Sequence, residues 1–273
     1  MATPDAPRVL TLPGPCGRLS ARDWGGEGPP VLLLHGMSGN SHWWDGVAPL
    51  LRGLRPIALD FRGHGLSAWG RDESDYRLDA FAADIDAAAR GLGLSAYAIA
   101  AHSFGARVAL EHASGAPAGL RKLAVLDFLC ELAAGDLDRF ARARERPQPA
   151  YASKEAILDR FRLHPRGTLL GPAALRSLGE SCVQPAAAGG WTWRFDWRAY
   201  AVRYVPVWPI LPAVAVPALA VRGERSAVMS REQLQRLAAA LPRARAEELP
   251  GAHHHLPLDA PEACAGLLRR FLL

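Results

Sequence analysis

The chain has 273 residues, 49% of them hydrophobic, and a formal net charge of +5 at pH 7. That length and apolar content can bury a large core, either as one α/β domain with an insertion or as two domains. No apolar run approaches the roughly 20 residues of a membrane span, and the Pro-rich residues 1–15 lack the features of a secretory signal, so we expect a cytoplasmic protein without membrane partners.

The first half of the chain alternates strand patterns with helix patterns. Residues 8–12 and 17–24 alternate apolar and polar side chains, which predicts an antiparallel pair at a sheet edge. Longer apolar runs predict buried strands, and amphipathic segments predict helices. The predicted buried strands are 31–34, 56–60, 98–101 and 122–127, and the predicted helices are 43–51, 78–91 and 104–112. This alternation indicates a mostly parallel, doubly wound sheet covered on both faces.

The alternation stops after the sixth predicted strand and resumes much later in the chain. Between these points the sequence predicts helices at 153–163 and from Pro172, an aromatic segment at 190–197, and no core strand. A long insertion of this kind is typical of a functional lid. The predicted α/β core is 1–128 and 213–273, and the predicted helical cap is 129–212. The last predicted elements are strands 218–223 and 244–249 and helices 230–241 and 259–271.

The junction at Ser103 has the pattern of a sharp strand-to-helix turn. The apolar strand pattern ends just before it, and Ala101 and Gly105 flank it two residues away on either side. Small side chains are needed there because strand and helix backbones pass close together and force the serine into a strained conformation. Such a turn lifts the hydroxyl clear of the sheet and directs helix amides toward whatever approaches it. The motif departs from G-x-S-x-G, since Ala101 replaces the first glycine.

Four motifs occur in a fixed order relative to the predicted strands. They are His35-Gly36, Asp60-x-Arg62-Gly63-His64-Gly65, Ala-His-Ser103-Phe-Gly, and Gly251-Ala-x-His254 before the last helix. This ordered set resembles the α/β-hydrolase family over nearly the whole chain apart from the insertion. The resemblance implies a parallel sheet and a catalytic serine, acid and histidine in that chain order.

The resemblance implies a catalytic triad built on Ser103. A serine hydroxyl is a poor nucleophile near neutral pH and needs a base. Three adjacent histidines compete for that role, and the family's spacing to Pro261-Glu262 selects His254. The family's usual acid position falls on Ser226, which cannot hold an imidazolium by charge.

Two carboxylates are alternatives for the triad acid. Asp127 ends the strand after the Ser103 helix, where some family members, haloalkane dehalogenases among them, place their acid. Glu224 follows Gly223 directly, but its side chain is expected to turn toward Arg222 or Arg225. We therefore predict Asp127 as the acid, with Glu224 as the alternative.

The resemblance also implies an oxyanion hole made by the backbone N–H groups of Met37 and Phe104. His35 and Trp43 are predicted to line the substrate pocket, and His35 is also expected to orient the oxyanion loop through hydrogen bonds. His102 is expected to point away from the serine hydroxyl, because side chains alternate along a strand.

Cysteines and basic residues indicate no further site. Cys16, Cys130, Cys182 and Cys264 include no close pair, which argues against zinc and against a disulfide framework. The densest basic stretch, residues 139–146, alternates with Ala and Glu like a solvated helix face, and no nucleic-acid motif accompanies it. We expect no metal, no cofactor and no nucleic-acid partner.

These residues together predict a serine hydrolase. The expected substrate is a small-to-medium apolar molecule with an ester, lactone or thioester bond, cleaved through an acyl-enzyme. A serine at the turn argues against haloalkane dehalogenase and epoxide hydrolase chemistry, which use aspartate there. The alternatives are a carbon–carbon bond hydrolase, a lyase, a cofactor-free cyclase or oxygenase, and a ligand-binding receptor with little turnover. Substrate identity and oligomeric state stay open.

Overall fold

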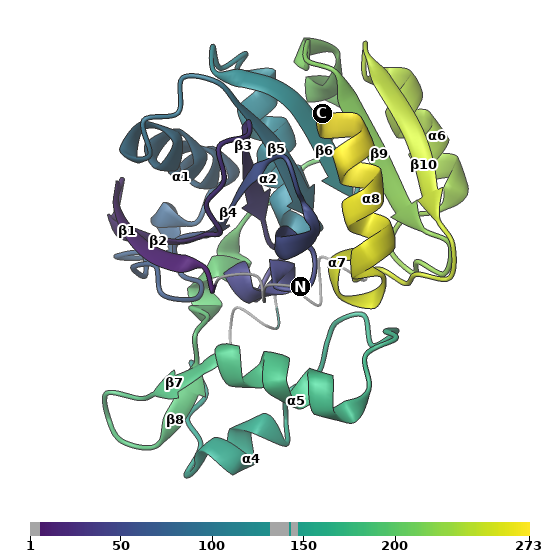
Figure 1. The fold of residues 1–273 in the computed structure, drawn as a ribbon. Coiled ribbons are helices and arrows are strands. Elements are labelled where there is room, and N and C mark those ends of the chain that lie inside the picture. Colours follow the sequence, from purple (N-terminus) through teal and green to yellow (C-terminus); the bar gives the residue numbers. More distant parts are fainter. Residues whose placement is uncertain (1–5, 132–141, 143–146) are drawn as a thin grey trace.

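A single mixed sheet organises the computed structural model, which describes residues 6–131, 142 and 147–273 (Figure 1). The described residues contribute eight strands in the order β1-β2-β4-β3-β5-β6-β9-β10. The strands are β1 (Arg8–Gly14), β2 (Gly17–Asp23), β3 (Pro30–Leu34), β4 (Arg55–Asp60), β5 (Tyr97–His102), β6 (Leu120–Leu126), β9 (Ala218–Gly223) and β10 (Ala244–Leu249). β1, β2 and β4 pair antiparallel, and the pairs from β4 to β10 are parallel. The predicted edge pair and the mostly parallel sheet are confirmed.

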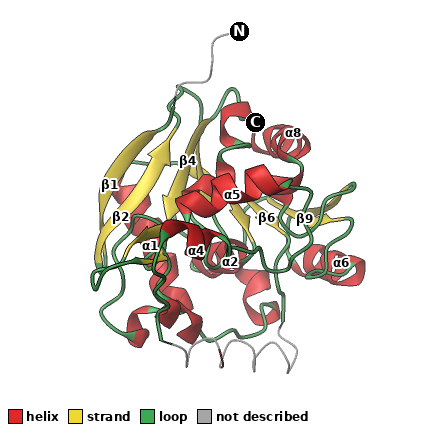
Figure 2. Ribbon diagram, turned by 90° about the horizontal axis from the view of Figure 1, so that it is seen from below, coloured by secondary structure: helices red, strands yellow, loops and turns green. Residues whose placement is uncertain are grey.

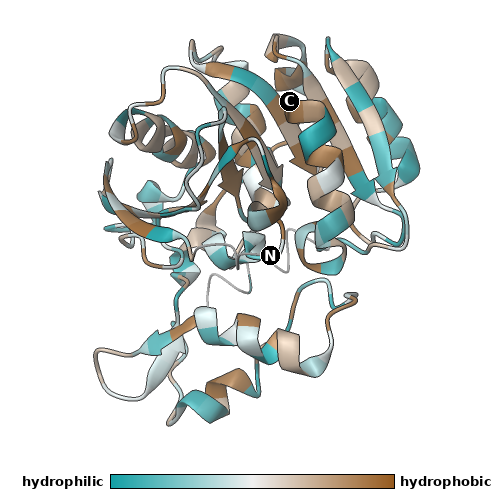
Figure 3. Ribbon diagram, viewed as in Figure 1, coloured by the Kyte–Doolittle hydropathy of each residue, from teal (hydrophilic) through white to brown (hydrophobic). Residues whose placement is uncertain are grey.

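Alternate side chains of the central strands pack on opposite faces of the sheet. Leu32 and Ile99 pack in the same cluster as residues of the helices on one face, α1 (Leu78–Gly91), α2 (Phe104–Ser114) and α6 (Arg231–Ala240). Val31 and Ala100 pack on the other face with α7 (Leu256–Asp259) and α8 (Pro261–Leu272). Burial on both faces explains why these strands are continuous apolar runs, which Figure 3 shows as brown central arrows.

Prolines alter two of the predicted helices. The predicted helix 43–51 is instead two short 3-10 helices, Ser41–Trp44 and Ala48–Leu50, because Pro49 lacks the N–H that a continuous helix would need. The predicted final helix, 259–271, corresponds to α8, which begins at Pro261 because proline is favoured at the first position of a helix; the short helix α7 before it was not predicted. No helix in the described part of the chain has both the length and the apolarity to cross a membrane.

The segment between β6 and β9 lies across the carboxyl ends of the parallel strands (Figures 1 and 2). It contains α4 (Lys154–Leu158), α5 (Pro172–Ser181) and a separate antiparallel ribbon of β7 (Val183–Pro185) and β8 (Trp191–Trp193). Helix α4 ends before the predicted residue 163, since Leu163 packs into the core cluster of the α8 face. The basic stretch at 139–146 lies outside the described residues except for Arg142, and part of the predicted cap lies outside them too.

A buried ion pair joins the glycine-rich turn after β4 to helix α1. Arg62 Nε donates to Asp84 Oδ2 at 2.9 Å, and its Nη2 donates to Oδ1 at 2.7 Å. The Arg62 backbone N–H also donates to Asp84 at 3.1 Å. Both side chains are almost fully buried, so neither charge has water to replace its partner. The pair therefore holds the turn that follows β4 against the helix layer.

Replacing Asp84 by alanine should lower the free energy of unfolding by about 3–5 kcal/mol, because the arginine would be left buried and unpaired. Urea denaturation followed by circular dichroism measures this loss. Asp79→Ala is the matched control on the same helix: its carboxylate is 61% exposed in its pair with Arg77. That variant should cost less than about 1 kcal/mol. Equal losses in the two variants would contradict a special role for the buried pair.

Candidate active site

Ser103 occupies a sharp turn between β5 and α2. Its backbone has φ 55° and ψ −121°, a strained conformation for a residue other than glycine. The preceding Ala101 is fully buried, and a Cβ added to Gly105 would lie 2.6 Å from the His35 carbonyl oxygen. Strand and helix thus pass too close for larger side chains at these two positions. The half-buried Ser103 side chain is left at the N-terminus of α2.

His254 joins Ser103 to Asp127 through its two ring nitrogens. Nε2 lies 3.1 Å from Ser103 Oγ, and Nδ1 lies 2.8 Å from Asp127 Oδ1. An ionised carboxylate can only accept hydrogen bonds, so Nδ1 carries the proton and donates it. The Nε2 lone pair therefore faces the serine hydroxyl. The histidine comes from the loop after β10, 151 positions beyond the serine and 127 beyond the aspartate.

Asp127 lies directly after β6 with φ 42° and is fully buried. Besides His254, two further groups donate to its carboxylate. The Gly223 backbone N–H donates to Oδ2 at 2.8 Å, and the Ser226 hydroxyl donates to Oδ1 at 2.7 Å. Ser226 stands where the family resemblance would put an acid. Here it supplies a hydrogen bond to the acid of a neighbouring strand.

Burial controls the ionisation of this pair. It raises the pKa of Asp127 to about 7, against the lowering effects of the Ser226 hydroxyl, the Gly223 amide and the Arg222 charge. Burial also lowers the pKa of His254 well below its ordinary value. Both shifts oppose charge on the buried groups, so the imidazole is neutral at neutral pH. A neutral imidazole can accept a proton from Ser103.

The loop after β3 passes against the serine. A Cβ added to Gly36 would lie 3.1 Å from Ser103 Cβ and 3.5 Å from its Oγ, so a larger residue there would crowd the serine side chain. The ring of His35 is fully buried; its Nδ1 donates to the Gly36 carbonyl at 2.8 Å and its Nε2 accepts from the Phe61 N–H at 3.2 Å. His35 thus holds the loop that carries Met37, as expected.

Two backbone N–H groups near Ser103 are available to a bound anion. Phe104 is the first residue of α2, and amides of a first helical turn have no acceptor within the helix. Among the described residues, neither its N–H nor that of Met37 donates to a protein acceptor. These are the two groups predicted to form an oxyanion hole, which stays a prediction.

Three predicted or alternative site residues make contacts of other kinds. The exposed Glu224 accepts from the Gly251 N–H at 2.7 Å, and its carboxylate is not bonded to His254 or to the expected arginines. Both ring nitrogens of His35 bond to backbone, and its place in the pocket stays a prediction. Trp43 is only 5% exposed and packs in the core cluster of the α8 face. Both rings are interior because the loop after β3 folds back onto the sheet.

Two further histidine rings lie beside that of His254, although neither residue was predicted to be catalytic. The ring centroid of His102 lies 4.8 Å from that of His254, and the centroid of His255 lies 4.9 Å from it. The alternation argument fails for His102 because the chain leaves the extended conformation at the next residue. Among the described residues, His102, His254 and His255 form the one group of potential metal ligands close enough to share an ion.

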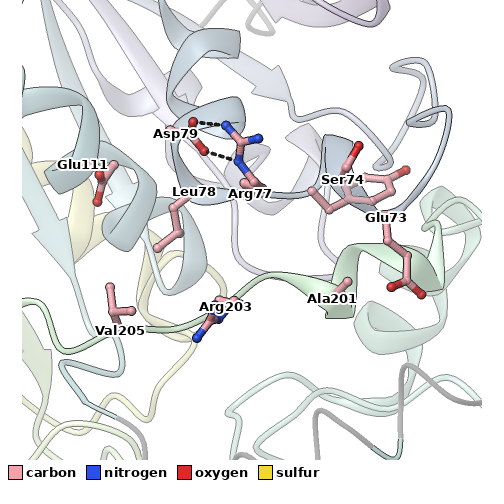
Figure 4. A pocket seen from close by; sticks show the side chains of 10 residues that line it. Glu73, Ser74, Arg77, Leu78, Asp79, Glu111, Ala201, Arg203 and Val205 are labelled. Atoms are coloured by element: carbon pink, nitrogen blue, oxygen red, sulfur yellow. Dashed lines mark hydrogen bonds and ion pairs between the residues drawn. The ribbon is translucent and has the colours of Figure 1, made fainter.

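A separate hollow of about 520 Å³ lies away from these residues (Figure 4). Its walls come from the start of α1, from Glu111 of α2 and from the chain at Ala201, Arg203 and Val205. Arg77 is paired with Asp79 at its rim. None of the residues around Ser103 lines it, so it is a different feature of the surface.

Comparisons with known proteins cover most of the chain. A family model described as the alpha/beta hydrolase family matches residues 31–267. An esterase of Mycobacterium tuberculosis is 27% identical over 94% of this chain and 87% of its own. A fluoroacetate dehalogenase of a Burkholderia species is 30% identical over 91% of this chain and 88% of its own. A thioesterase domain from the curacin biosynthetic pathway has a TM-score of 0.80 and 26% identity, covering 97% of this chain and 99% of that one.

Replacing Ser226 by alanine should raise the pKa of the Asp127–His254 pair. The hydroxyl donates to the charged carboxylate, and losing a hydrogen bond to a charged group shifts a pKa by about one unit. NMR titration of the His254 ring measures the shift. Ser226→Thr keeps the hydroxyl and should titrate like the parent protein. Identical curves for the alanine variant and the parent would show that the serine does not stabilise the carboxylate.

Proposed function

The chain belongs to the α/β hydrolase family, and on that premise we propose that it is a serine hydrolase. The proposed reaction is hydrolysis of an ester, lactone or thioester of a small-to-medium apolar substrate through an acyl-enzyme. The observation that carries the proposal is the continuous hydrogen-bonded path from Ser103 through His254 to the buried Asp127. Its serine stands at a strained turn beside two free backbone amides, the arrangement that nucleophilic acyl transfer requires.

In the proposed mechanism Ser103 Oγ attacks the acyl carbonyl carbon while its proton passes to His254 Nε2, 3.1 Å away. Asp127 holds the ring in the required tautomer and stabilises the imidazolium that forms. The imidazolium then protonates the leaving alcohol or thiol, and the acyl group stays on the serine. In the second half a water molecule gives its proton to the same nitrogen and attacks the acyl-enzyme. The carboxylic acid leaves and the serine is restored.

The oxyanion of each tetrahedral intermediate would accept from the Met37 and Phe104 N–H groups. Both amides are fixed by the fold, so they need no reorganisation when the charge develops. The partial positive charge at the N-terminus of α2 adds to the stabilisation. His35 supports this role indirectly, since its hydrogen bonds set the path of the loop at Gly36.

Apolar surroundings and named relatives support the substrate class. The Tyr204 ring lies 6.2 Å from the Phe104 ring, centroid to centroid, and the partly buried Met37 packs on the same core. The esterase and thioesterase relatives support cleavage of an oxygen or sulfur ester. The dehalogenase relative acts on a different bond. A serine at position 103 favours acyl transfer over that chemistry.

Residues 129–212 form a cap over the site in this proposal, with 1–128 and 213–273 as the core. Several insertion residues bond to core loops near the catalytic residues. The Asn40 side-chain amide donates to the Ser181 carbonyl at 3.1 Å, and the Thr168 hydroxyl donates to Asp259 at 2.6 Å. The Pro165 carbonyl accepts from His255, the residue after the catalytic histidine, at 2.9 Å. The insertion therefore belongs to the immediate surroundings of the site.

A fluorophosphonate probe should label the parent protein at one serine, because only an activated hydroxyl reacts with it readily. Ser103→Ala should abolish labelling and reduce hydrolysis of short p-nitrophenyl esters by at least about 10³-fold. Ser114→Ala, at the far end of the same helix, should still be labelled. Mass spectrometry of the labelled peptide identifies the site. Labelling of the Ser103→Ala variant, or none of the folded parent, would overturn the proposal.

Asp127→Asn should lower kcat about 10³- to 10⁴-fold while the fold is retained, because the imidazole loses both its orienting charge and its tautomer. Glu224→Gln is the matched control, since that carboxylate only accepts from the Gly251 amide. It should change kcat by less than a few-fold. Steady-state ester hydrolysis and circular dichroism of both variants make the comparison. The opposite pattern would assign the acid role to Glu224.

A further inference from the structure

Three buried histidines, one of them the proposed general base, form a cluster beside Ser103. His102 ends β5, and His254 and His255 follow one another in the loop after β10. Their side chains belong to residues that are 1%, 3% and 4% exposed, and one ring nitrogen from each lies within 4.8 Å of the others. The proposed hydrolytic mechanism uses only the second of these rings. The mechanism therefore gives no role to His102 and His255.

The hydrogen bonds of the two unused rings determine where their lone pairs lie. His102 Nε2 is 2.9 Å from the His254 carbonyl oxygen, and His255 Nε2 is 2.9 Å from the Pro165 carbonyl oxygen. A carbonyl oxygen only accepts, so both Nε2 atoms carry protons. In the neutral rings each Nδ1 then has a free lone pair. Both Nδ1 atoms are buried and have no hydrogen-bond partner among the described residues.

The third ring has the complementary arrangement. His254 donates its Nδ1–H to Asp127 and presents the Nε2 lone pair toward Ser103. All three rings thus have one nitrogen donating to an oxygen and the other unprotonated. This is the usual state of histidines that ligate a metal, in which the outer nitrogen donates to a carbonyl or carboxylate and sets the tautomer.

We propose that His102, His254 and His255 bind a divalent transition-metal ion, with Zn²⁺ as the reference ion, and that the bound ion reversibly inhibits the enzyme. Three neutral imidazoles are a ligand set that zinc accepts, with water or the Ser103 hydroxyl at the fourth position. The site is regulatory, because the ion occupies the nitrogen that the reaction needs. The inhibitory part rests on the proposed hydrolase function, whereas metal binding itself does not.

The cluster needs only a modest contraction to hold an ion. Tetrahedral ligation with bonds of about 2.0–2.1 Å puts ligand nitrogens about 3.3 Å apart. One ring nitrogen of each histidine already lies within 4.8 Å of the others, and ring rotation with small shifts would close the remaining distance on binding.

Binding would remove the general base from the reaction. Once its Nε2 coordinates an ion, His254 cannot take the Ser103 proton, and the hydroxyl returns to being a poor nucleophile. Asp127 stays bonded to Nδ1 and strengthens the ligand. Inhibition is therefore expected to track occupancy of the site and to be reversed by a chelator.

Binding is tested by titrating the purified full-length protein with Co²⁺, whose four-coordinate complexes absorb in the visible range, and then displacing it with Zn²⁺. The parent and Ser103→Ala should both bind one ion per chain. His102→Phe and His255→Phe should each weaken binding at least about 100-fold, since losing even an outer-shell partner typically costs 10–100-fold. His253→Asn, the neighbour outside the cluster, should bind like the parent. Parent-like binding by both phenylalanine variants would overturn the site.

Inhibition is tested by ester hydrolysis with Zn²⁺ and then with excess EDTA, each rate divided by the metal-free rate of the same variant. The parent and His253→Asn should lose at least about 90% of their activity at saturating occupancy and recover it with the chelator, as ligation of the only general base requires. Slower fluorophosphonate labelling of the metal-bound parent tests the same point without any variant. Full activity with the site occupied would overturn the inhibitory role. Histidine-dependent Co²⁺ binding by a protein that neither hydrolyses esters nor reacts with the probe would leave the metal site standing and overturn the hydrolase function.

Discussion

The hydrogen bonding of one buried carboxylate organises the site. Asp127 is fully buried, so leaving its charge without donors would cost several kcal/mol. Its donors come from two other parts of the fold: Gly223 ends β9 and Ser226 follows it, and His254 follows β10. Satisfying the carboxylate therefore joins the ends of three strands. The same bonds set the tautomer of the histidine, which links the stability of this edge of the sheet to its chemistry.

Burial gives the site two properties at once. It lowers the pKa of His254, which keeps a lone pair available to Ser103. Burial also lowers the pKa of His102 and His255, whose Nε2 atoms donate to backbone carbonyls. The proposed hydrolysis and the proposed metal inhibition both use the unprotonated Nε2 of His254, whose Nδ1 proton is held by Asp127.

The sequence was least informative about which way a side chain faces. His35 and Trp43 were predicted to line the substrate pocket, and His102 was expected to point away from the serine hydroxyl. In the structure His35 bonds to backbone on both sides of its ring, Trp43 packs in the core, and His102 lies beside His254. Each of these outcomes depends on how a loop or strand end folds back on the sheet. Residue periodicity holds only inside regular elements.

The sequence by itself determined the strands of the main sheet, the turn at Ser103 and the pair of candidate acids, because periodicity and small residues flanking a turn are local properties. It did not determine that Asp127 meets His254 while Glu224 bonds to a loop amide. It also held no sign that Ser226 supports the acid of another strand. Those contacts join residues 27 to 127 positions apart, so only the parallel order of the strands, settled by packing on both faces of the sheet, could decide them.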